Sequence, residues 1–271
     1  DDDIISMGGT FMRLHDQGHE VHVAYQTSGN IAVTDEFVTR FIDFAVGFEE
    51  MFGMDNSKSI EQLSSAEQFI SSKKKDQMDT REIRAVKGLI RRGEAKATCR
   101  YVGLPEGRWH FMNMPFYETG TIEKKPLGEV DILITMELLR KLKPHQVYCA
   151  GDLADPHGTH RVCLEAVFEA LRRIKAAGDD WIQDCWVWLY KGAWQEWDIA
   201  EIEMAIPMSP DQVKKKRFGI FIHQSQKDMV PFQGADNREF WQRAEDRNAN
   251  TANLYAELGM TKYAAMEAFV R

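Results

Sequence analysis

The sequence lacks several features that would assign a protein class at once. Its 271 residues include only four cysteines, and no two are spaced as Cys-x-x-Cys, which argues against a cysteine zinc site. No apolar run is long enough to span a membrane, and no stretch has the pattern of a secretory signal. Walker A, Gly-x-Ser-x-Gly and Gly-x-Gly-x-x-Gly motifs are also missing. We therefore expect a soluble, cytoplasmic protein whose cysteines are free thiols.

An excess of basic residues is missing as well. The formal net charge is −8 and the isoelectric point is about 5.6, which argues against nucleic acid as the main partner. Two short basic runs, at 73–75 and 214–217, predict solvated helix faces. We expect a small-molecule partner, with neither nucleic acid nor membrane involved, and the sequence leaves the oligomeric state open.

What the sequence does contain is an alternation of helical and strand patterns. Strands are expected at 20–26, 108–114, 146–150, 184–190 and 199–205, and helices at 4–17, 35–52, 59–75, 80–100, 129–142, 157–176, 210–223 and over most of 237–271. This alternation predicts one α/β domain over residues 1–271, a Rossmann-like three-layer α/β/α fold with a mostly parallel sheet. Ligands of such sheets bind beyond the carboxyl ends of the strands.

Acidic residues open the sequence. Asp1, Asp2 and Asp3 stand directly before the first helical pattern. The helix dipole favours carboxylates at a helix start, so a solvated cap would explain them without any chemistry. The alternative is that one carboxylate binds a metal ion while its neighbour acts as a base.

Two histidines follow the strand expected at 146–150. His157 and His160 are three residues apart, so both can face one ligand at a helix start. Pro156 and Gly158 favour a turn beyond the strand end, where α/β sheets bind ligands. A functional site and a chance surface pair explain this pattern equally well.

Further candidates lie in two of the expected helices. His223 ends the helix expected at 210–223, where a histidine can simply cap the last turn. Arg81 and Arg84 lie in the helix expected at 80–100. Surface ion pairing is the default for these arginines, and a substrate clamp is the alternative.

Taken together, these segments resemble the LmbE-like (PIG-L) family. Residues 1–10, followed by Gly-His-Glu-Val at 18–21 and Thr-Ser-Gly at 27–29, resemble the opening of that family, which has His-Pro-Asp-Asp-Glu at the end of its first strand. The segment 157–160 is similar to its second metal motif, and 214–226 is similar to its late helix ending in His-x-Ser-Gln. The order and spacing of these blocks cover nearly the whole chain.

The resemblance implies a metal-dependent deacetylase and assigns its chemistry. Asp1 would be the general base, and Asp2 and His160 would bind the metal. His157 would stabilise or protonate the tetrahedral intermediate. The implied metal is zinc, with Fe²⁺ or Mn²⁺ as alternatives, and the implied substrate is an N-acetylglucosamine-type amino sugar that loses its acetyl group by hydrolysis.

The remaining candidates receive roles by the same resemblance. His223 would be a catalytic-site histidine that lines the pocket. Either Arg81 or Arg84 would contact the substrate.

Departures from the family pattern suggest what else belongs to the protein. The family's first histidine ligand would lie two residues before Asp1, Asp3 replaces a glutamate, and Gly158-Thr159 replace Pro-Asp. We therefore expect an N-terminally truncated fragment of a longer protein. It resembles the deacetylase module fused C-terminal to glucosamine-6-phosphate deaminase in Bacteroidetes-type bacteria. Two alternatives remain: a non-catalytic sugar-binding or regulatory domain attached to that deaminase, and a nucleotide-binding Rossmann domain.

Overall fold

The computed structural model describes residues 1–54, 57–74, 77–121, 123–151, 153, 158–193, 195–227 and 236–271. The helices are α1 (Asp2–Asp16), α2 (Asp35–Met51), α3 (Ser57–Ser72), α4 (Arg81–Val102), α5 (Glu129–Leu142), α6 (Thr159–Ala176), α7 (Pro210–Phe221) and α8 (Phe240–Glu257), with short 3₁₀ turns η1 (Asn30–Ala32), η2 (Asp180–Asp184) and η3 (Gln224–Gln226). The strands are β1 (Val23–Tyr25), β2 (Trp109–Phe111), β3 (Gln146–Ala150), β4 (Trp186–Tyr190), β5 (Met204–Met208) and β6 (Ala265–Val270). Within these residues, no helix is both long and apolar enough to cross a lipid bilayer.

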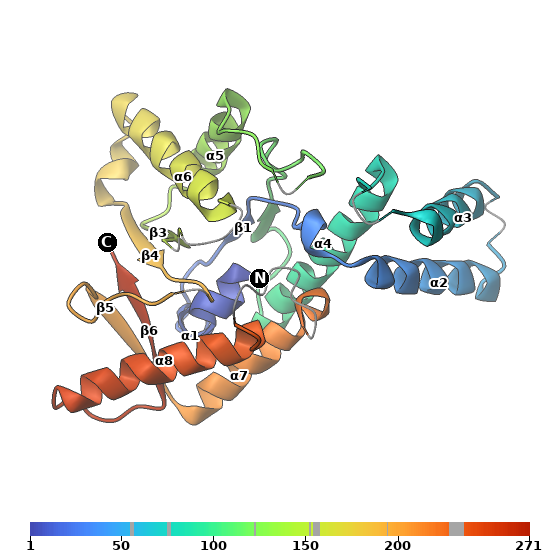
Figure 1. Ribbon diagram of the computed structural model, residues 1–271. Coiled ribbons are helices and arrows are strands. Elements are labelled where there is room, and N and C mark those ends of the chain that lie inside the picture. The colour runs from blue at the N-terminus through green and yellow to red at the C-terminus, as the bar shows by residue number, and fades with distance from the viewer. Residues whose placement is uncertain are drawn as a thin grey trace.

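The strands form two sheets, and helices cover both faces of the larger one. Strands β1 and β2 pair in parallel, and the larger sheet has the order β3-β4-β6-β5. On one face, Cys149 packs with Leu164 and Val167 of α6. On the other face, Tyr148 packs in a core formed largely by α1, α4, α7 and α8 (Figure 1). This is the α/β fold with helices on both faces that the alternation predicted.

The larger sheet departs from the expected strand pattern at its C-terminal part. Strands β3 and β4 are parallel, whereas β6 runs antiparallel to both β4 and β5. The expectation that the tail is mostly helical is therefore wrong for residues 265–270. The strand expected at 199–205 is also misplaced, because residues 199–201 form a turn and the strand runs from Met204 to Met208.

The first helix, α1, is broken near its start. Met7 has φ −135° and ψ 26°, which lies outside the helical range, so the helix consists of two segments that meet at this residue. The first segment carries the opening acidic residues, and the second ends at Asp16. The break sets the direction of the first turn relative to the rest of α1.

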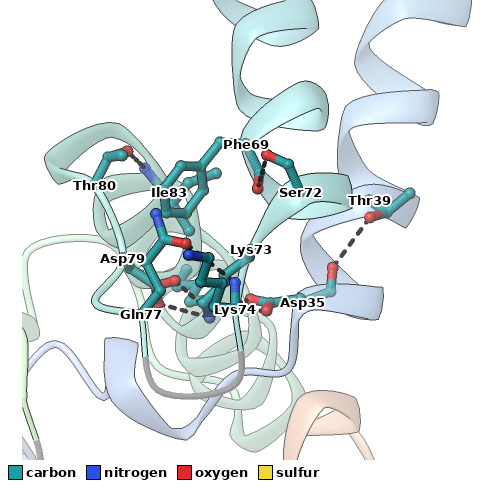
Figure 2. Close-up of polar contacts among 11 residues, drawn as sticks. Asp35, Thr39, Phe69, Ser72, Lys73, Lys74, Gln77, Asp79, Thr80 and Ile83 are labelled. Carbon is teal, nitrogen blue, oxygen red and sulfur yellow. Dashed lines mark hydrogen bonds and ion pairs between the residues drawn. The ribbon is translucent and has the colours of Figure 1, made fainter.

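Helices α2 and α3 form a hairpin beside the sheet-containing body (Figure 1). The hairpin packs against α4 through its own apolar cluster, which includes Val38, Ile42 and Ile83. At its base, Figure 2 shows Lys73 and Asp79 converging with Asp35, the first residue of α2. Lys73 Nζ lies 2.8 Å from an Asp35 oxygen and 2.6 Å from an Asp79 oxygen, and Lys87 Nζ contacts the same two carboxylates at 2.7 and 2.8 Å. The expectation that residue 73 lies on a solvated face is therefore wrong.

Replacing Asp35 by asparagine should destabilise the fold at neutral pH and much less in acid. Partial burial would raise the pKa of Asp35, but Lys73 and Lys87 hold it below its ordinary value. A carboxyl whose pKa is lowered by folding stabilises the protein above its unfolded pKa of about 3.9 and loses that contribution as the pH falls through the folded value. Leaving the buried Lys87 with one partner fewer should cost about 1–3 kcal/mol at pH 7.

Thermal unfolding followed by circular dichroism between pH 7 and pH 3 measures this effect. Asn at the exposed position Asp43, on the same helix, is the matched control and should behave as the wild type. An Asp35→Asn penalty that stays constant over the whole pH range would contradict the ion-pair explanation.

Candidate active site

The opening carboxylates project into a cavity of about 1740 Å³. Asp1 stands at the N-cap position of α1, but its side chain makes no capping hydrogen bond. Instead, Arg91 Nη2 donates to Asp1 Oδ1 at 2.5 Å. Tyr25 donates its phenol hydrogen to Asp3 Oδ2 at 2.9 Å. The carboxylates are therefore held by side chains of α4 and β1 and do not form a solvated cap.

Asp2 meets a histidine from a distant part of the chain. His160 lies in the first turn of α6, after Gly158, which adopts the left-handed conformation with φ +65°. His160 Nε2 lies 3.4 Å from Asp2 Oδ2. Burial alone would raise the pKa of Asp2, but His160 and Arg91 together hold it well below its ordinary value. Asp2 is thus an ionised carboxylate beside an imidazole, and both line the cavity.

This pair has the spacing expected of two ligands on one metal ion. Two ligand atoms that each lie about 2.1 Å from a tetrahedral zinc ion are about 3.4 Å apart. An imidazole nitrogen and a carboxylate oxygen are common zinc ligands, and they also suit Fe²⁺ and Mn²⁺. No group of three or more potential ligands occurs among the described residues, so the site as described offers two protein ligands.

His223 is buried beside α4. Its side chain is only 1% exposed, and its Nε2 lies 3.0 Å from the Thr98 hydroxyl oxygen. Burial, followed by the nearby positive charge of Arg91, lowers the pKa of His223 well below its ordinary value, so the ring is neutral at neutral pH. Its Nδ1 is buried without a hydrogen-bonding partner, and the residue lines the cavity. It therefore does not serve as a simple helix cap.

The residues after His223 connect the chain next to this histidine to α4 and η1. Glu94 accepts hydrogen bonds from the Ser225 backbone NH and hydroxyl, both at 2.7 Å. Gln226 donates to the Ala32 carbonyl at 2.7 Å. The His-x-Ser-Gln segment is thus largely a buried structural connection, and Glu94 also lies 3.7 Å from Arg91.

Two residues of this site are absent from the sequence-based candidates. Arg91 holds Asp1, and Glu94 anchors the segment after His223. Arg81 and Arg84 both line the cavity, and neither forms an ion pair with another of the described residues. The sequence offers several arginines along α4 and no local signal that distinguishes Arg91 among them. His157 falls outside the described residues, so the structure does not place it.

A paired carboxylate and imidazole therefore line a cavity beyond the carboxyl end of β3, where α/β sheets bind ligands. The chain belongs to the PIG-L family, described as GlcNAc-PI de-N-acetylase, which matches residues 1–171. The family resemblance of the sequence is thereby confirmed.

The chain is also similar to a curated relative and to two solved structures. A glucosamine-6-phosphate deaminase-like protein of Bacteroides thetaiotaomicron is 55% identical over 273 residues. The match covers all of this chain and 41% of that protein, in its C-terminal part.

The solved structures share the fold at low sequence identity. The N,N'-diacetylchitobiose deacetylase of Pyrococcus horikoshii is 19% identical with a TM-score of 0.56, covering 99% of this chain and 78% of that one. The 4-carboxy-2-hydroxymuconate hydratase GalB of Pseudomonas putida is 14% identical with a TM-score of 0.58, covering 99% and 90%. Because these two proteins are named for different reactions, the fold alone does not decide the activity.

Proposed function

We propose that this chain is a metal-dependent N-deacetylase that removes the acetyl group from an N-acetylglucosamine-type amino sugar. The observation that carries the proposal is the 3.4 Å approach of Asp2 and His160, with Asp1 beside them in a cavity, in a member of the PIG-L family. Asp2 and His160 would hold zinc, which when bound polarises a carbonyl and makes a water molecule easier to deprotonate.

Side chains of this protein would carry out the proton transfers and stabilise the intermediate. Asp1 takes the proton of the attacking water, and Arg91 fixes the orientation of that carboxylate through its 2.5 Å contact. His157 stabilises or protonates the tetrahedral intermediate. The neutral His223 offers a buried ring nitrogen toward the same cavity. The products are acetate and the free amine of the sugar.

We assign the substrate contacts to the side of α4 that carries Arg84 and Arg91. Arg84 and Arg91 are seven residues apart, so they lie on one side of the helix, about 10 Å apart along its axis. Arg84 Nε is buried without a hydrogen-bonding partner, which favours Arg84 over the exposed Arg81 as the residue that binds the distal part of the sugar.

We also propose that this single domain works within a longer polypeptide fused to a glucosamine-6-phosphate deaminase-like part. The relative named above supports this, since the chain spans 41% of its length.

The direct test is acetate release by the full-length protein reconstituted with zinc. We expect N-acetylglucosamine or its 6-phosphate to yield equal amounts of acetate and free amine. Chelation should reduce the rate to background, and added zinc, Fe²⁺ or Mn²⁺ should restore it.

The described site offers only two protein ligands for a metal, which favours one competing function, a non-catalytic sugar-binding or regulatory domain. A metal-loaded protein that binds amino sugars but releases no acetate from any of them would establish that alternative.

A further inference from the structure

The break in α1 leaves backbone groups that helical hydrogen bonds do not satisfy, and distant side chains satisfy them. Glu267 of β6 accepts from the Gly9 NH at 2.9 Å, the Thr10 NH at 2.6 Å and the Thr10 hydroxyl at 2.6 Å. On the other side of Met7, Arg247 of α8 donates to the Ser6 carbonyl at 3.4 Å. One carboxylate and one guanidinium therefore hold the two segments of α1 on either side of the break.

The charges of Glu267 and Arg247 are both buried, and each lies beside a residue of opposite charge. Glu267 is fully buried, and Lys216 Nζ lies 2.7 Å from its Oε1. Lys216 also donates to Asn248 Oδ1 at 2.9 Å, so its expected place on a solvated helix face is wrong. Arg247 Nε lies 3.1 Å from Glu196 Oε2. Burying these ions costs hydration free energy, so stability alone is a weak reason for placing them at this point.

Gly8 and Gly9, next to the break, pack so closely against their neighbours that a larger side chain would not fit at either position. A Cβ atom added to Gly9 would lie 2.2 Å from Met208 Sδ. One added to Gly8 would lie 3.0 Å from Lys216 Cγ and 2.9 Å from Ile4 Cδ1. Close packing therefore fixes α1 where Glu267 and Arg247 bind it.

We infer that Glu267 and Arg247 are positioning residues: by holding the break in α1, they direct its first turn so that Asp1 and Asp2 reach Arg91 and His160. The first turn is the part of α1 that carries the candidate ligand Asp2, with Asp1 at its N-cap, and it meets the rest of the helix at the break. The inference rests on the proposed function for its link to catalysis, whereas the contacts themselves belong to the described structure.

Three variants of the full-length protein test this inference. Thr10→Val removes the hydroxyl that donates to Glu267 and keeps the shape of the side chain. Glu267→Gln removes the charge. Thr251→Val is the control, because Thr251 is equally buried but bonds only to a carbonyl within α8. The measurements are amide hydrogen exchange of residues 2–6, zinc affinity by chelator competition, and kcat and KM.

Thr10→Val should speed exchange in residues 2–6, weaken zinc binding about 10-fold and lower kcat with little change in KM. Glu267→Gln should do the same more strongly, and Thr251→Val should match the wild type. If Glu267→Gln does not fold, Thr10→Val decides. Unchanged exchange, zinc affinity and kcat in folded Thr10→Val would overturn the inference. A wild type that releases no acetate would refute the proposed function instead, and exchange in residues 2–6 would still decide the positioning role.

Discussion

Replacing Asp1 by asparagine should lower kcat of the full-length protein by about 10²–10⁴-fold while leaving zinc binding nearly intact. Asn keeps the size and the hydrogen-bonding oxygen of Asp1 but cannot accept a proton at neutral pH. The proposed metal ligands are Asp2 and His160, which lie 3.4 Å apart without the participation of Asp1. KM should change little, because Arg91 and Arg84 remain in the cavity.

The measurement combines steady-state acetate release with metal analysis of the same preparation. Asp16→Asn is the matched control, since Asp16 is exposed at the other end of the same helix and should have no effect. Full turnover by Asp1→Asn would remove Asp1 as the base. Loss of zinc together with turnover would show instead that Asp1 is a ligand.

Replacing His160 by alanine should abolish zinc binding and therefore activity. His160 provides the imidazole of the described pair, and its loss leaves Asp2 as the one remaining ligand of that pair. Because even outer partners of metal ligands typically contribute 10–100-fold to affinity, removing a ligand should weaken zinc binding by more than about 100-fold. The fold should survive, since the apolar core does not depend on this side chain.

Zinc content after dialysis and zinc affinity by chelator competition measure the effect. His145→Ala is a suitable control, because His145 is exposed just before β3, at the opposite end of that strand. An alanine variant at position 160 that retains stoichiometric zinc would disprove the metal site as proposed.

Local sequence signals predicted much of the helical framework. Ser209 followed by Pro210 predicted the start of α7, and Ser209 caps it by accepting from the Gln212 NH. Asp79 and Thr80 were both possible caps of α4, and Thr80 is the one that accepts from the Ile83 NH. Such caps depend on residues three positions apart, so they can be recognised without knowledge of the tertiary structure.

The strand at the C-terminal end could not be recognised in this way. Strand β6 carries a charged residue, Glu267, at a fully buried position, and it lacks the alternation of a half-exposed strand. Its structure depends on pairing with β4 and β5 and on Lys216 from α7, all of which are distant in the sequence. Nonlocal pairing of this kind overrides local propensity.

The contacts of the candidate site likewise include some that could be predicted from the sequence and others that could not. The resemblance to the PIG-L family implied that Asp2 and His160 lie together, and their side chains are 3.4 Å apart. The contact between Asp1 and Arg91 required the rotation of α4 about its axis, which the pattern of charges does not reveal. The break at Met7 was not predicted either, although Gly8 and Gly9, which follow it, are residues that weaken a helix.

The hairpin of α2 and α3 has an energetic consequence. It holds its own small apolar cluster and is tied at its base by the contacts among Asp35, Lys73, Asp79 and Lys87. Segments with separate cores can open at a lower free energy than the whole molecule. The hairpin should therefore open and close as one cooperative unit, while the sheet and the carboxylates of the candidate site keep their positions.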